Sequence, residues 1–564
     1  MTSEKNVMAI VSFYPDRRSI EVPIGATILQ AAQKAGIVLE TPCNCVGICS
    51  KCAVRLDVDS LRNISTTAPL SSEGASTDHA WVLSCQTEVL GDIAVELPGP
   101  EQSGTIRILS YGLMRVVDLD PCIKKTYSEE KGKTSVFALD RLLAEEPGDT
   151  RTTNFGVVVD IGTTTMVASL VDLSNGQEIA TASSLNPQSL HAQDVLSRIH
   201  FAAEEAGLKI MHSVLVEEIN RLTGELARAS DVATDSIYEM VFSGNTCMLH
   251  LATGNNPSSL GKFPYIPLIS GGNHVSANRQ GLNIANSGQI YLPPIIAGFV
   301  GADITSGILA TRLHQRTGTT LLVDIGTNGE MVLARNGRLC ATSTAAGPAF
   351  EGMNISCGMR AGRGAIEAFD VAEDGTIAVK TIESAKAVGI CGSGLLDIVG
   401  ELVDHGVIAG NGRFVDPQKS DLPVPLETRL IKHEGKAAFQ VAENILLSQK
   451  DVRQVQLAKG AVRTGIEFLL KDAGIEAGEV DRILIAGSFG YHLQEKSLLN
   501  LGLLPKVFAG KIDFVGNTSK SGGQAFLLNL GVRDEMAALV KKIFVIELVG
   551  IPDFDKVFVR CLGF

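Results

Sequence analysis

The chain has 564 residues, of which 45% are hydrophobic and 20% charged, so it holds enough apolar material for about three or four domains of ~150 residues. Its net charge of −13 argues against nucleic acid as a partner, because phosphate binding requires a basic surface. Residues 1–6 do not resemble a signal peptide, and Pro293, Pro294 and Asp303 interrupt the most apolar run, Ile290 to Ala310. We therefore expect a cytoplasmic protein without a membrane partner.

The first hundred residues combine strand patterns with one helix pattern. Val7 to Phe13 and Ser19 to Val22 read as two strands joined by a turn. Residues 28–35 place apolar side chains on one helical face, directly after Thr27, a natural N-cap. Cys52 to Val58 reads as a third strand, and a cysteine-rich loop separates it from the helix.

Four of the eleven cysteines fall within ten residues, and Cys85 follows downstream. Five residues separate Cys43 from Cys49, and two separate Cys49 from Cys52. Iron–sulfur clusters need soft thiolate ligands, and plant-type ferredoxins take three from one loop and the fourth from a distant position. Zinc sites of this kind usually pair two Cys-x-x-Cys units, of which only one is present, and disulfides are typical of exported proteins, so the spacing favours an iron–sulfur cluster over both. If Cys45 replaced Cys43, the gap before Cys49 would fit no 2Fe–2S pattern.

This spacing and this order of elements resemble the adrenodoxin-like branch of the 2Fe–2S ferredoxins. The resemblance implies a β-grasp ferredoxin domain over residues 1–98. It also implies that one 2Fe–2S cluster is held by Cys43, Cys49, Cys52 and Cys85.

A domain boundary is predicted at Pro98-Gly99-Pro100. We interpret residues 99–152 as a linker or small middle domain, with a possible strand at Ile106 to Leu109 and an amphipathic piece at Val136 to Leu143. Cys122 stands alone in this segment and is interpreted as an ordinary thiol rather than a ligand.

A motif of strand, aspartate, glycine turn and second strand occurs twice. It contains Asp160 and Gly162 in one copy and Asp324 and Gly326 in the other, 324 − 160 = 164 residues apart, so the chain contains two similar halves. A strand after the glycine turn excludes a P-loop or a dinucleotide fingerprint, because both place a helix there. A hairpin of this kind wraps its turn around a phosphate, with backbone N–H groups and threonine hydroxyls as donors and the aspartate facing Mg²⁺.

The pair of motifs resembles the two phosphate motifs of the actin, sugar-kinase and heat-shock-protein-70 ATPase superfamily. The resemblance implies two RNase-H-like lobes, at residues 153–320 and 321–564, which clamp ATP and Mg²⁺ in a cleft between them. Asp160 and Asp324 are then the candidates for assisting the attacking water. The resemblance also implies a nucleotide-binding set of Gly162, Thr163, Thr164, Gly326 and Thr327, with Gly487 and Ser488 from an adenosine-side motif at residues 483–490.

Two further strand-to-helix turns are candidates for the same site. Asn245 is expected to orient water or Mg²⁺. Gly392 and Ser393 begin a glycine-rich helix that either touches the nucleotide or packs closely on a sheet. Cys391 precedes this turn, as a cluster-binding cysteine does in related activators of 2-hydroxyacyl-CoA dehydratases. Those proteins need a second cysteine further on, and none follows here until Cys561, so we do not expect a bridging cluster.

Two predictions concern segments outside these motifs. A helix that begins near Asp194 is expected to run towards Leu222. The segment from Ile543 to Val559 reads as rich in β-structure.

A ferredoxin-type domain fused to an actin-like ATPase resembles the reductive activators of corrinoid proteins. The resemblance implies ATP-dependent return of Co(II) to Co(I) in a methyltransferase or O-demethylase system, a corrinoid protein as partner, a low-potential electron donor and a homodimer. One alternative is a small-molecule kinase with a ferredoxin redox sensor, in which Asp194 or Asp303 would be the general base. A chaperone would leave the cluster without a role, and a plain electron carrier would leave the ATPase without one.

Overall fold

The computed structural model describes residues 8–15, 17–37, 39, 52–66, 79–97, 118–487 and 493–564. The predictions for Cys43, Cys45, Cys49, Ser488 and the strand at 106–109 lie outside these residues. The chain divides into two compact units, which we treat separately. The first unit contains residues 1–107, 352–395 and 423–454, and the second contains residues 108–351, 396–422 and 455–564.

The N-terminal part of the first unit is a five-stranded sheet with the order β2-β1-β7-β3-β5, in which β1 and β7 run parallel. Helix α1 begins after Thr27, whose side chain accepts a hydrogen bond from the Gln30 amide, so the predicted N-cap is confirmed. The core beneath the helix contains Phe13, Leu56 and Val95. The elements are β1 (Met8–Tyr14), β2 (Arg18–Pro23), α1 (Ile28–Lys34), β3 (Ala53–Asp57), α2 (Val58–Leu61), β4 (Ile64–Thr66), β5 (His79–Leu83), β6 (Thr87–Val89) and β7 (Ile93–Glu96).

The rest of the first unit carries two three-stranded sheets, with the orders β21-β20-β22 and β23-β24-β25. Their elements are β20 (Ala365–Val371), β21 (Ile377–Thr381), β22 (Gly389–Ile390), α8 (Val424–Glu427), β23 (Leu430–His433), β24 (Lys436–Ala442) and β25 (Ile445–Ser448). Two helices cross the boundary between the units along the chain: α7 (Gly392–Asp404) and α9 (Gln449–Ala473).

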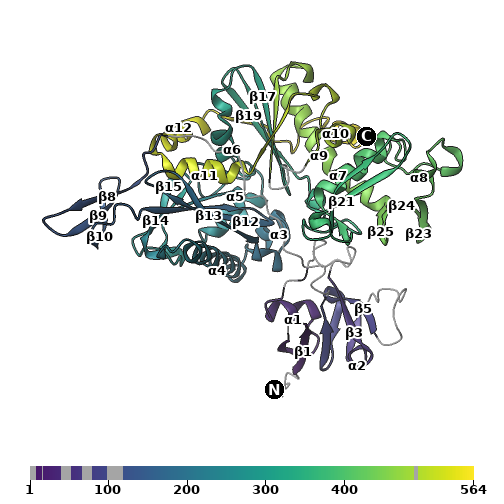
Figure 1. Ribbon diagram of the computed structural model, residues 1–564, viewed down its shortest axis with the longest axis horizontal. Helices are drawn as coiled ribbons and strands as arrows, with labels where there is room; N and C mark the ends of the chain where they lie inside the picture. Colours follow the sequence, from purple (N-terminus) through teal and green to yellow (C-terminus); the bar gives the residue numbers. More distant parts are fainter. Residues whose placement is uncertain are drawn as a thin grey trace. The chain divides into compact units, whose positions relative to one another are not determined.

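The second unit begins with a three-stranded antiparallel sheet, made of β8 (Ile123–Ser128), β9 (Lys133–Ala138) and β10 (Arg141–Pro147). The amphipathic piece predicted at Val136 to Leu143 is therefore the end of β9, a turn and the start of β10 (Figure 1). Along β9, Thr134, Val136 and Ala138 are buried and alternate with less buried residues, which is the period of a half-buried strand.

Two six-stranded sheets follow, and they repeat one arrangement. The first has the order β13-β12-β11-β14-β16-β15 and the second β27-β26-β17-β18-β19-β28. In each, three antiparallel strands come first, and the first of them then pairs in parallel with later strands. Their bounds are β11 (Phe155–Ile161), β12 (Thr165–Asp172), β13 (Glu178–Leu185), β14 (Ile237–Gly244), β15 (Asn273–Ser276), β16 (Gln289–Leu292), β17 (Thr319–Ile325), β18 (Gly329–Arg335), β19 (Arg338–Thr344), β26 (Arg482–Ala486), β27 (Ile512–Gly516) and β28 (Phe544–Val545). The two similar halves predicted from the sequence are thus present as two similar sheets.

Helices cover both faces of the first sheet. Along β11, Val157 and Val159 belong to a core that includes buried residues of α4 (Glu205–Ala229), whereas Val158 belongs to the core beneath α6 (Ala302–Thr311) and α11 (Thr518–Leu528). The helices α6 and α11 pack so closely that a Cβ atom on Gly522 would lie 2.1 Å from the Ser306 carbonyl oxygen. Figure 1 shows this helix pair beside the strands of both sheets.

The C-terminal end of α11 binds the segment that leads into β8. The Asp120 amide donates to the Leu528 carbonyl oxygen, and the Leu530 amide, at the start of α12 (Leu530–Val540), donates to the Asp120 carbonyl oxygen, both at 2.9 Å. Asn529 Nδ2 donates to the Asp118 carbonyl oxygen at 2.7 Å. Residues 118–120 are therefore fixed to the junction between α11 and α12.

Two of the sequence predictions are wrong in this unit. The helix after Asp194 ends early, as α3 (Val195–Phe201), and the chain re-enters helix at α4, because Gly207 lets the first turn of α4 lie against the Phe201 carbonyl oxygen. The segment 543–559 contains only the two-residue β28 and then α13 (Phe554–Cys561), whose Phe554 and Phe558 rings stack at the helical spacing of four residues. The remaining helices are α5 (Thr246–Ala252) and α10 (Glu495–Asn500). Among the described residues, no helix has both the length and the apolar composition to cross a membrane.

Candidate functional site

The two glycine turns line one cleft within the second unit. The hydroxyl oxygens of Thr164 and Thr327 lie 3.3 Å apart, so the two turns meet directly. Of the residues predicted from the sequence, the cleft is lined by Asp160, Gly162, Thr163, Thr164, Asn245, Asp324, Gly326, Thr327 and Gly487. It is also lined by residues that the sequence did not assign to a nucleotide: Asp303, Glu330, Glu351, Asn517, Thr518 and Ser519.

A buried arginine supports the first turn. Arg198 on α3 is 0% exposed, and its Nη2 donates to the Thr163 carbonyl oxygen at 2.7 Å. Its other hydrogen bonds also go to neutral acceptors, including Gln188 Oε1 and the Ala192 carbonyl oxygen, each at 3.0 Å. Burial lowers the pKa of Arg198 to about 10, so the guanidinium remains charged at neutral pH. A buried cation behind this turn favours an anion in front of it.

Two asparagines fix the shape of the first turn. Asn245 caps α5 by accepting from the Met248 amide, and its Nδ2 donates to Thr163 Oγ1 at 3.0 Å. Asn186 Nδ2 donates to the Gly162 carbonyl oxygen at 2.8 Å. Asn245 thus lines the cleft and orients the threonine hydroxyl, and its role towards water or Mg²⁺ stays a prediction.

Asp160 is held by the N-terminal end of α11. Its two carboxylate oxygens accept separate hydrogen bonds, from Asn517 Nδ2 and from Ser519 Oγ, each at 2.7 Å. Burial raises the pKa of Asp160, and the two hydrogen bonds oppose that shift. The carboxylate is therefore fixed in one orientation by residues that lie more than 350 positions later in the chain.

The second turn carries a pair of acids instead of one. In the β17–β18 hairpin, Asp324 lies directly opposite Glu330, whereas in the β11–β12 hairpin Asp160 lies opposite Val167. Opposite residues of antiparallel strands share a face, and both Asp324 and Glu330 line the cleft. Burial and the neighbouring Asp303 and Asp324 raise the pKa of Glu330 well above its ordinary value.

Asp303, on the first turn of α6, completes a group of four acids, of which Glu330 is buried and Asp160, Asp303 and Asp324 are partly buried. Burial, assisted by the charge of Asp160, raises the pKa of Asp303 to about 7. Burial, together with the charges of Asp303 and Asp160, raises the pKa of Asp324 to about 7. Carboxylates that share a site repel one another, and a bound divalent cation removes that repulsion. Carboxylate oxygens are the ligands that Mg²⁺ prefers, so the donor set of this cleft fits Mg²⁺.

The residues missed in the sequence differ in how far they could have been found. Glu330 could have been predicted from the sequence, because a hairpin that turns at residues 326–328 places it opposite Asp324. Asp303 was singled out only as a kinase base or as a break in an apolar run. Arg198 and Ser519 carry no local signal, since only the tertiary fold brings them to the turns.

The adenosine-side motif is described only in part. Gly487 follows β26 with φ of +120°, and a Cβ atom there would lie 2.4 Å from the Ile325 carbonyl oxygen, so this position requires glycine. Ser488 lies outside the described residues. Gly487 is thus placed at the cleft, directly beside the second turn.

Gly392 and Ser393 belong to the first unit, where their local contacts are those of close packing. Ser393 Oγ donates to the Glu367 carbonyl oxygen at 2.9 Å, and a Cβ atom on Gly394 would lie 2.1 Å from the Ile366 carbonyl oxygen. The buried Cys391 thiol also contacts the Ile366 carbonyl oxygen, at 3.1 Å. These contacts agree with the packing interpretation of this turn, and its nucleotide role stays a prediction.

Two of the four predicted cluster ligands lie side by side in the ferredoxin-type sheet. The sulfur atoms of Cys52 and Cys85 are 3.3 Å apart, and the two residues are 1% and 8% exposed. The pairing of Ala53 with Leu83 between β3 and β5 brings them together, because each cysteine lies just beyond one end of that pairing. Two adjacent buried thiols are a donor set that fits a thiolate-bound iron–sulfur cluster. Cys43 and Cys49 lie outside the described residues.

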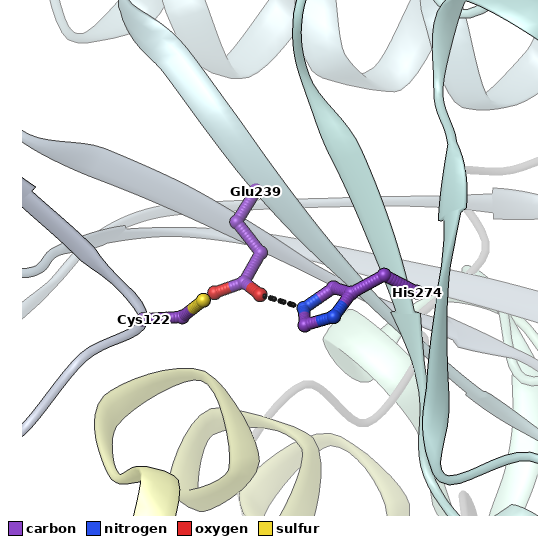
Figure 2. Close-up of side chains that lie close together, drawn as sticks. All are labelled: Cys122, Glu239 and His274. Atoms are coloured by element: carbon purple, nitrogen blue, oxygen red, sulfur yellow. Dashed lines mark hydrogen bonds and ion pairs between the residues drawn. The ribbon is translucent and has the colours of Figure 1, made fainter. Parts of the chain in front are cut away.

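Cys122, Glu239 and His274 form a second group of metal-binding residue types, with ligand atoms within 4.8 Å of one another (Figure 2). Arg533 donates to both oxygens of Glu239, at 2.9 and 3.0 Å, and its Nη1 lies 3.1 Å from His274 Nε2. The guanidinium already compensates the Glu239 charge and would repel a metal ion. Burial raises the pKa of Cys122 to about 11, so this residue is a neutral thiol. The group is therefore best described as a buried ion pair of Glu239 and Arg533, with Cys122 and His274 beside it.

Three family models match consecutive parts of the chain. A 2Fe-2S iron-sulfur cluster binding domain matches residues 13–90, the RACo middle region matches residues 155–316, and the C-terminal domain of RACo, an ASKHA domain, matches residues 318–564.

A curated relative decides the family. The corrinoid activation enzyme RamQ of Eubacterium limosum is 32% identical to the chain over 414 residues, which cover 72% of this chain and 69% of the relative. The chain belongs to the RACo family. A second relative is the [Co(II) methylated amine-specific corrinoid protein] reductase of Methanosarcina barkeri. It is 25% identical over 428 residues, which cover 69% of this chain and 73% of the relative.

A solved structure, the reductive activator for corrinoid,iron-sulfur protein, matches over 98% of both chains with a TM-score of 0.72 and 28% identity. The predicted fold class is confirmed, with a ferredoxin-type domain, a middle region and an ASKHA domain in that order.

Proposed function

We propose that this RACo-family chain is an ATP-dependent reductive activator that returns the Co(II) of a corrinoid protein to Co(I), in a methyltransferase or O-demethylase system. The observation that carries the proposal is one chain that combines a buried pair of cysteine sulfurs with an acid-lined cleft between duplicated phosphate turns. Both curated relatives and the solved structure are named for work on corrinoid proteins, which supports the same assignment.

The cleft residues divide between phosphate and cation. The first turn, supported by Arg198, binds phosphate oxygens through its backbone N–H groups and the hydroxyls of Thr163 and Thr164. Asp303, Asp324 and Glu330 hold Mg²⁺, which when bound neutralises the charge that develops on the phosphates. Asp160, oriented by Asn517 and Ser519, accepts the proton of the attacking water.

ATP hydrolysis has to be coupled to electron transfer through conformation. Plant-type 2Fe–2S centres have potentials near roughly −400 mV, and each ~59 mV of uphill one-electron transfer costs about a factor of ten in equilibrium. A nucleotide can supply such a factor only if it favours one of two conformations that differ in affinity for the partner. A nucleotide in this cleft would touch both halves at once, because Thr164 of one half lies against Thr327 of the other. It could therefore favour one arrangement of the two halves over another.

The ferredoxin-type domain, residues 1–98, is assigned the role of electron carrier. When bound, a 2Fe–2S cluster supplies a one-electron centre, and the residues proposed to hold it are Cys43, Cys49, Cys52 and Cys85. The pairing of β3 with β5 keeps the sulfurs of Cys52 and Cys85 adjacent and shielded from water. An external low-potential donor and a homodimeric state belong to the same proposal.

The test is anaerobic absorbance spectroscopy of Co(II) corrinoid proteins mixed with the chain and a low-potential reductant. The probes are the corrinoid,iron-sulfur protein and the methylated amine-specific corrinoid protein of Methanosarcina barkeri. The Co(I) spectrum is expected with Mg-ATP and not with a non-hydrolysable analogue, and Cys85→Ser and Asp324→Asn should each remove it. Co(I) formation that does not depend on ATP would contradict the proposal, and phosphoryl transfer to a small molecule would favour the kinase.

A further inference from the structure

A short loop of the second unit exposes an unusual amount of apolar surface. Between the 3₁₀ turn Ser258–Gly261 and β15, the segment 262–268 contains Phe263, Ile266 and Leu268, which are 72%, 63% and 64% exposed. Single exposed apolar residues are ordinary, but three large ones within six positions form a patch, and patches mark interaction sites. Each of these three side chains therefore leaves more than half of its surface open to solvent.

The loop is nevertheless fixed from beneath. The Tyr265 ring packs edge-on against Phe263 and Phe299, with ring centroids 5.8 and 5.1 Å away. The Leu268 amide donates to His250 Nε2 at 3.0 Å, and His250 is itself 0% exposed on α5. A patch that is ordered before binding loses less conformational entropy when a partner binds.

The underside of the loop leads directly to the nucleotide cleft. A Cβ atom on Gly298 would lie 2.2 Å from the Tyr265 carbonyl oxygen, so residues 298–299 are pressed against the loop. Two residues further on, a Cβ atom on Gly301 would lie 2.6 Å from the backbone of Asn245, and Asp303 of the same segment lines the cleft. Residues 298–303 therefore contact the apolar loop at one end and supply a carboxylate to the cleft at the other.

The size of the patch indicates what kind of partner it fits. Three side chains expose at most a few hundred Å², about the size of the functional patches on monomers, whereas an obligate homodimer buries roughly 1,000 Å² or more per partner. The patch therefore suits a transient partner better than a second copy of the chain. A partner that must bind and leave with each electron is such a transient one.

We infer that Phe263, Ile266 and Leu268 form part of the surface that binds the corrinoid protein, and that the segment 298–303 makes this binding depend on the nucleotide. The inference rests on the proposed function, since it names the surface through which that partner is held. When Asp303 takes part in cation binding, the segment that carries it shifts the loop, and the affinity for the partner changes accordingly.

The experiment compares loop variants with an equally exposed control. Phe263→Ser, Leu268→Ser and their double variant are matched with Val549→Ser, whose side chain is 65% exposed on the same unit. The expected result for the double variant is an increase of at least tenfold in the KM for the Co(II) corrinoid protein. Basal ATPase activity and thermal midpoint should remain within twofold and a few degrees of the wild type. Val549→Ser should leave all of these values unchanged.

Direct binding separates this inference from the proposed function. Sedimentation of the wild type with the Co(II) corrinoid,iron-sulfur protein is measured with Mg-ATP and with Mg-ADP, and the affinity is expected to differ between the nucleotides. If the complex forms and the loop variants weaken it, the surface is supported even where no Co(I) appears, and only the proposed function fails. An unchanged KM and affinity in the double variant would overturn the surface, as would a wild type that binds no corrinoid protein. A shift of the variants to a smaller oligomer would instead assign the loop to a second copy.

Discussion

The two glycine turns of the second unit share one hairpin design and differ in their electrostatic surroundings. Behind the first turn stands the buried cation Arg198, which donates to the Thr163 carbonyl oxygen. Beside the second turn stand acids: Glu330 lies opposite Asp324, and Thr327 Oγ1 donates to Glu351 Oε1 at 2.5 Å. The two hairpins share one backbone pattern, and the difference in their neighbours is what leads us to propose phosphate binding at the first turn and metal binding at the second.

The two motif aspartates show the same contrast. Asp160 accepts hydrogen bonds at both oxygens from the N-terminal end of α11. Within the part of the chain that the structure describes, no side chain donates a hydrogen bond to Asp324, and the pKa of Asp324 is raised to about 7 by burial and by Asp303 and Asp160. The fixed carboxylate suits work on a water molecule, and the one without a donor suits a cation.

The largest expected effect distinguishes these two aspartates. Asp324→Asn should remove Mg²⁺-dependent ATP hydrolysis, with a loss of roughly 1,000-fold, because a metal ligand of the acidic turn is lost. Asp160→Asn should lower kcat by roughly 100-fold and shift the Mg²⁺ concentration for half-maximal activity much less than Asp324→Asn does, because it removes a base and a neighbouring charge but not a ligand. Steady-state kinetics at varied Mg²⁺ checks both. Equal shifts in Mg²⁺ dependence would show that the two turns do not divide the work.

A second variant tests the cation behind the first turn. Arg198→Gln should raise the KM for ATP by roughly 10- to 100-fold, because a hydrogen bond to a charged group contributes about 1.5–3 kcal/mol and the buried positive charge is lost as well. The Mg²⁺ dependence should change little. Arg221→Gln, at a half-exposed position on α4, is the control for loss of an arginine, and thermal melting of both variants checks that they fold. An unchanged KM would assign Arg198 a purely structural role.

The acids Asp303 and Asp324 should also make Mg²⁺ binding in the cleft sensitive to pH. Asp303 and Asp324 must lose protons to bind Mg²⁺, and each has a pKa of about 7. The affinity for Mg²⁺, measured by titration of the ATPase, should therefore rise by roughly 30-fold between pH 6 and pH 7, because two groups deprotonate, and level off above about pH 8. A profile that is flat over this range would contradict the raised pKa values.

Stability without ligand should change in the opposite direction. A carboxyl group whose pKa is raised in the folded state contributes stability that is complete below its unfolded pKa, near 3.8, and is lost as pH rises towards 7. The metal-free protein should therefore unfold at a lower temperature at pH 8 than at pH 6, by a few degrees. Mg-ATP should raise the midpoint more at pH 8 than at pH 6, which differential scanning calorimetry measures.

The smallest expected effect concerns the two threonine hydroxyls that meet across the cleft. Thr164→Val and Thr327→Val each remove one hydroxyl of a pair 3.3 Å apart, and a neutral hydrogen bond contributes about 0.5–1.5 kcal/mol. Each variant should lower kcat/KM for ATP by roughly two- to tenfold. The Thr327 variant should lose more, because it also removes the hydroxyl that donates to Glu351 Oε1. A larger loss in the Thr164 variant than in the Thr327 variant would indicate that the first turn makes the tighter contact with ATP.

Local pattern accounts for what could be predicted from the sequence. The strand–Asp–Gly–Thr hairpins, the cap at Thr27 and the adjacency of Cys52 to Cys85 all follow from short-range order plus one resemblance. The prediction of β-structure for residues 543–559 is wrong because the apolar residues there follow a helical spacing: Phe554 and Phe558 are four positions apart and stack on one face of α13. The roles of Arg198 and Ser519, and the place of Asp303 among the cleft acids, could not be predicted for another reason, because each depends on a contact made across the fold.

The helix α11 connects chemistry at one end to chain attachment at the other. Its N-terminal end binds Asp160 through Ser519, and its C-terminal end holds residues 118–120, which lead back along the chain to the ferredoxin-type domain. At 11 residues it is about 16 Å long, so a tilt of about 10° at the cleft would displace the far end by about 3 Å. Such a displacement exceeds the roughly 1 Å that thermal motion produces in a well-ordered backbone. In mechanical terms, the helix would then act as a lever, moved at one end by a hydrogen bond to one carboxylate.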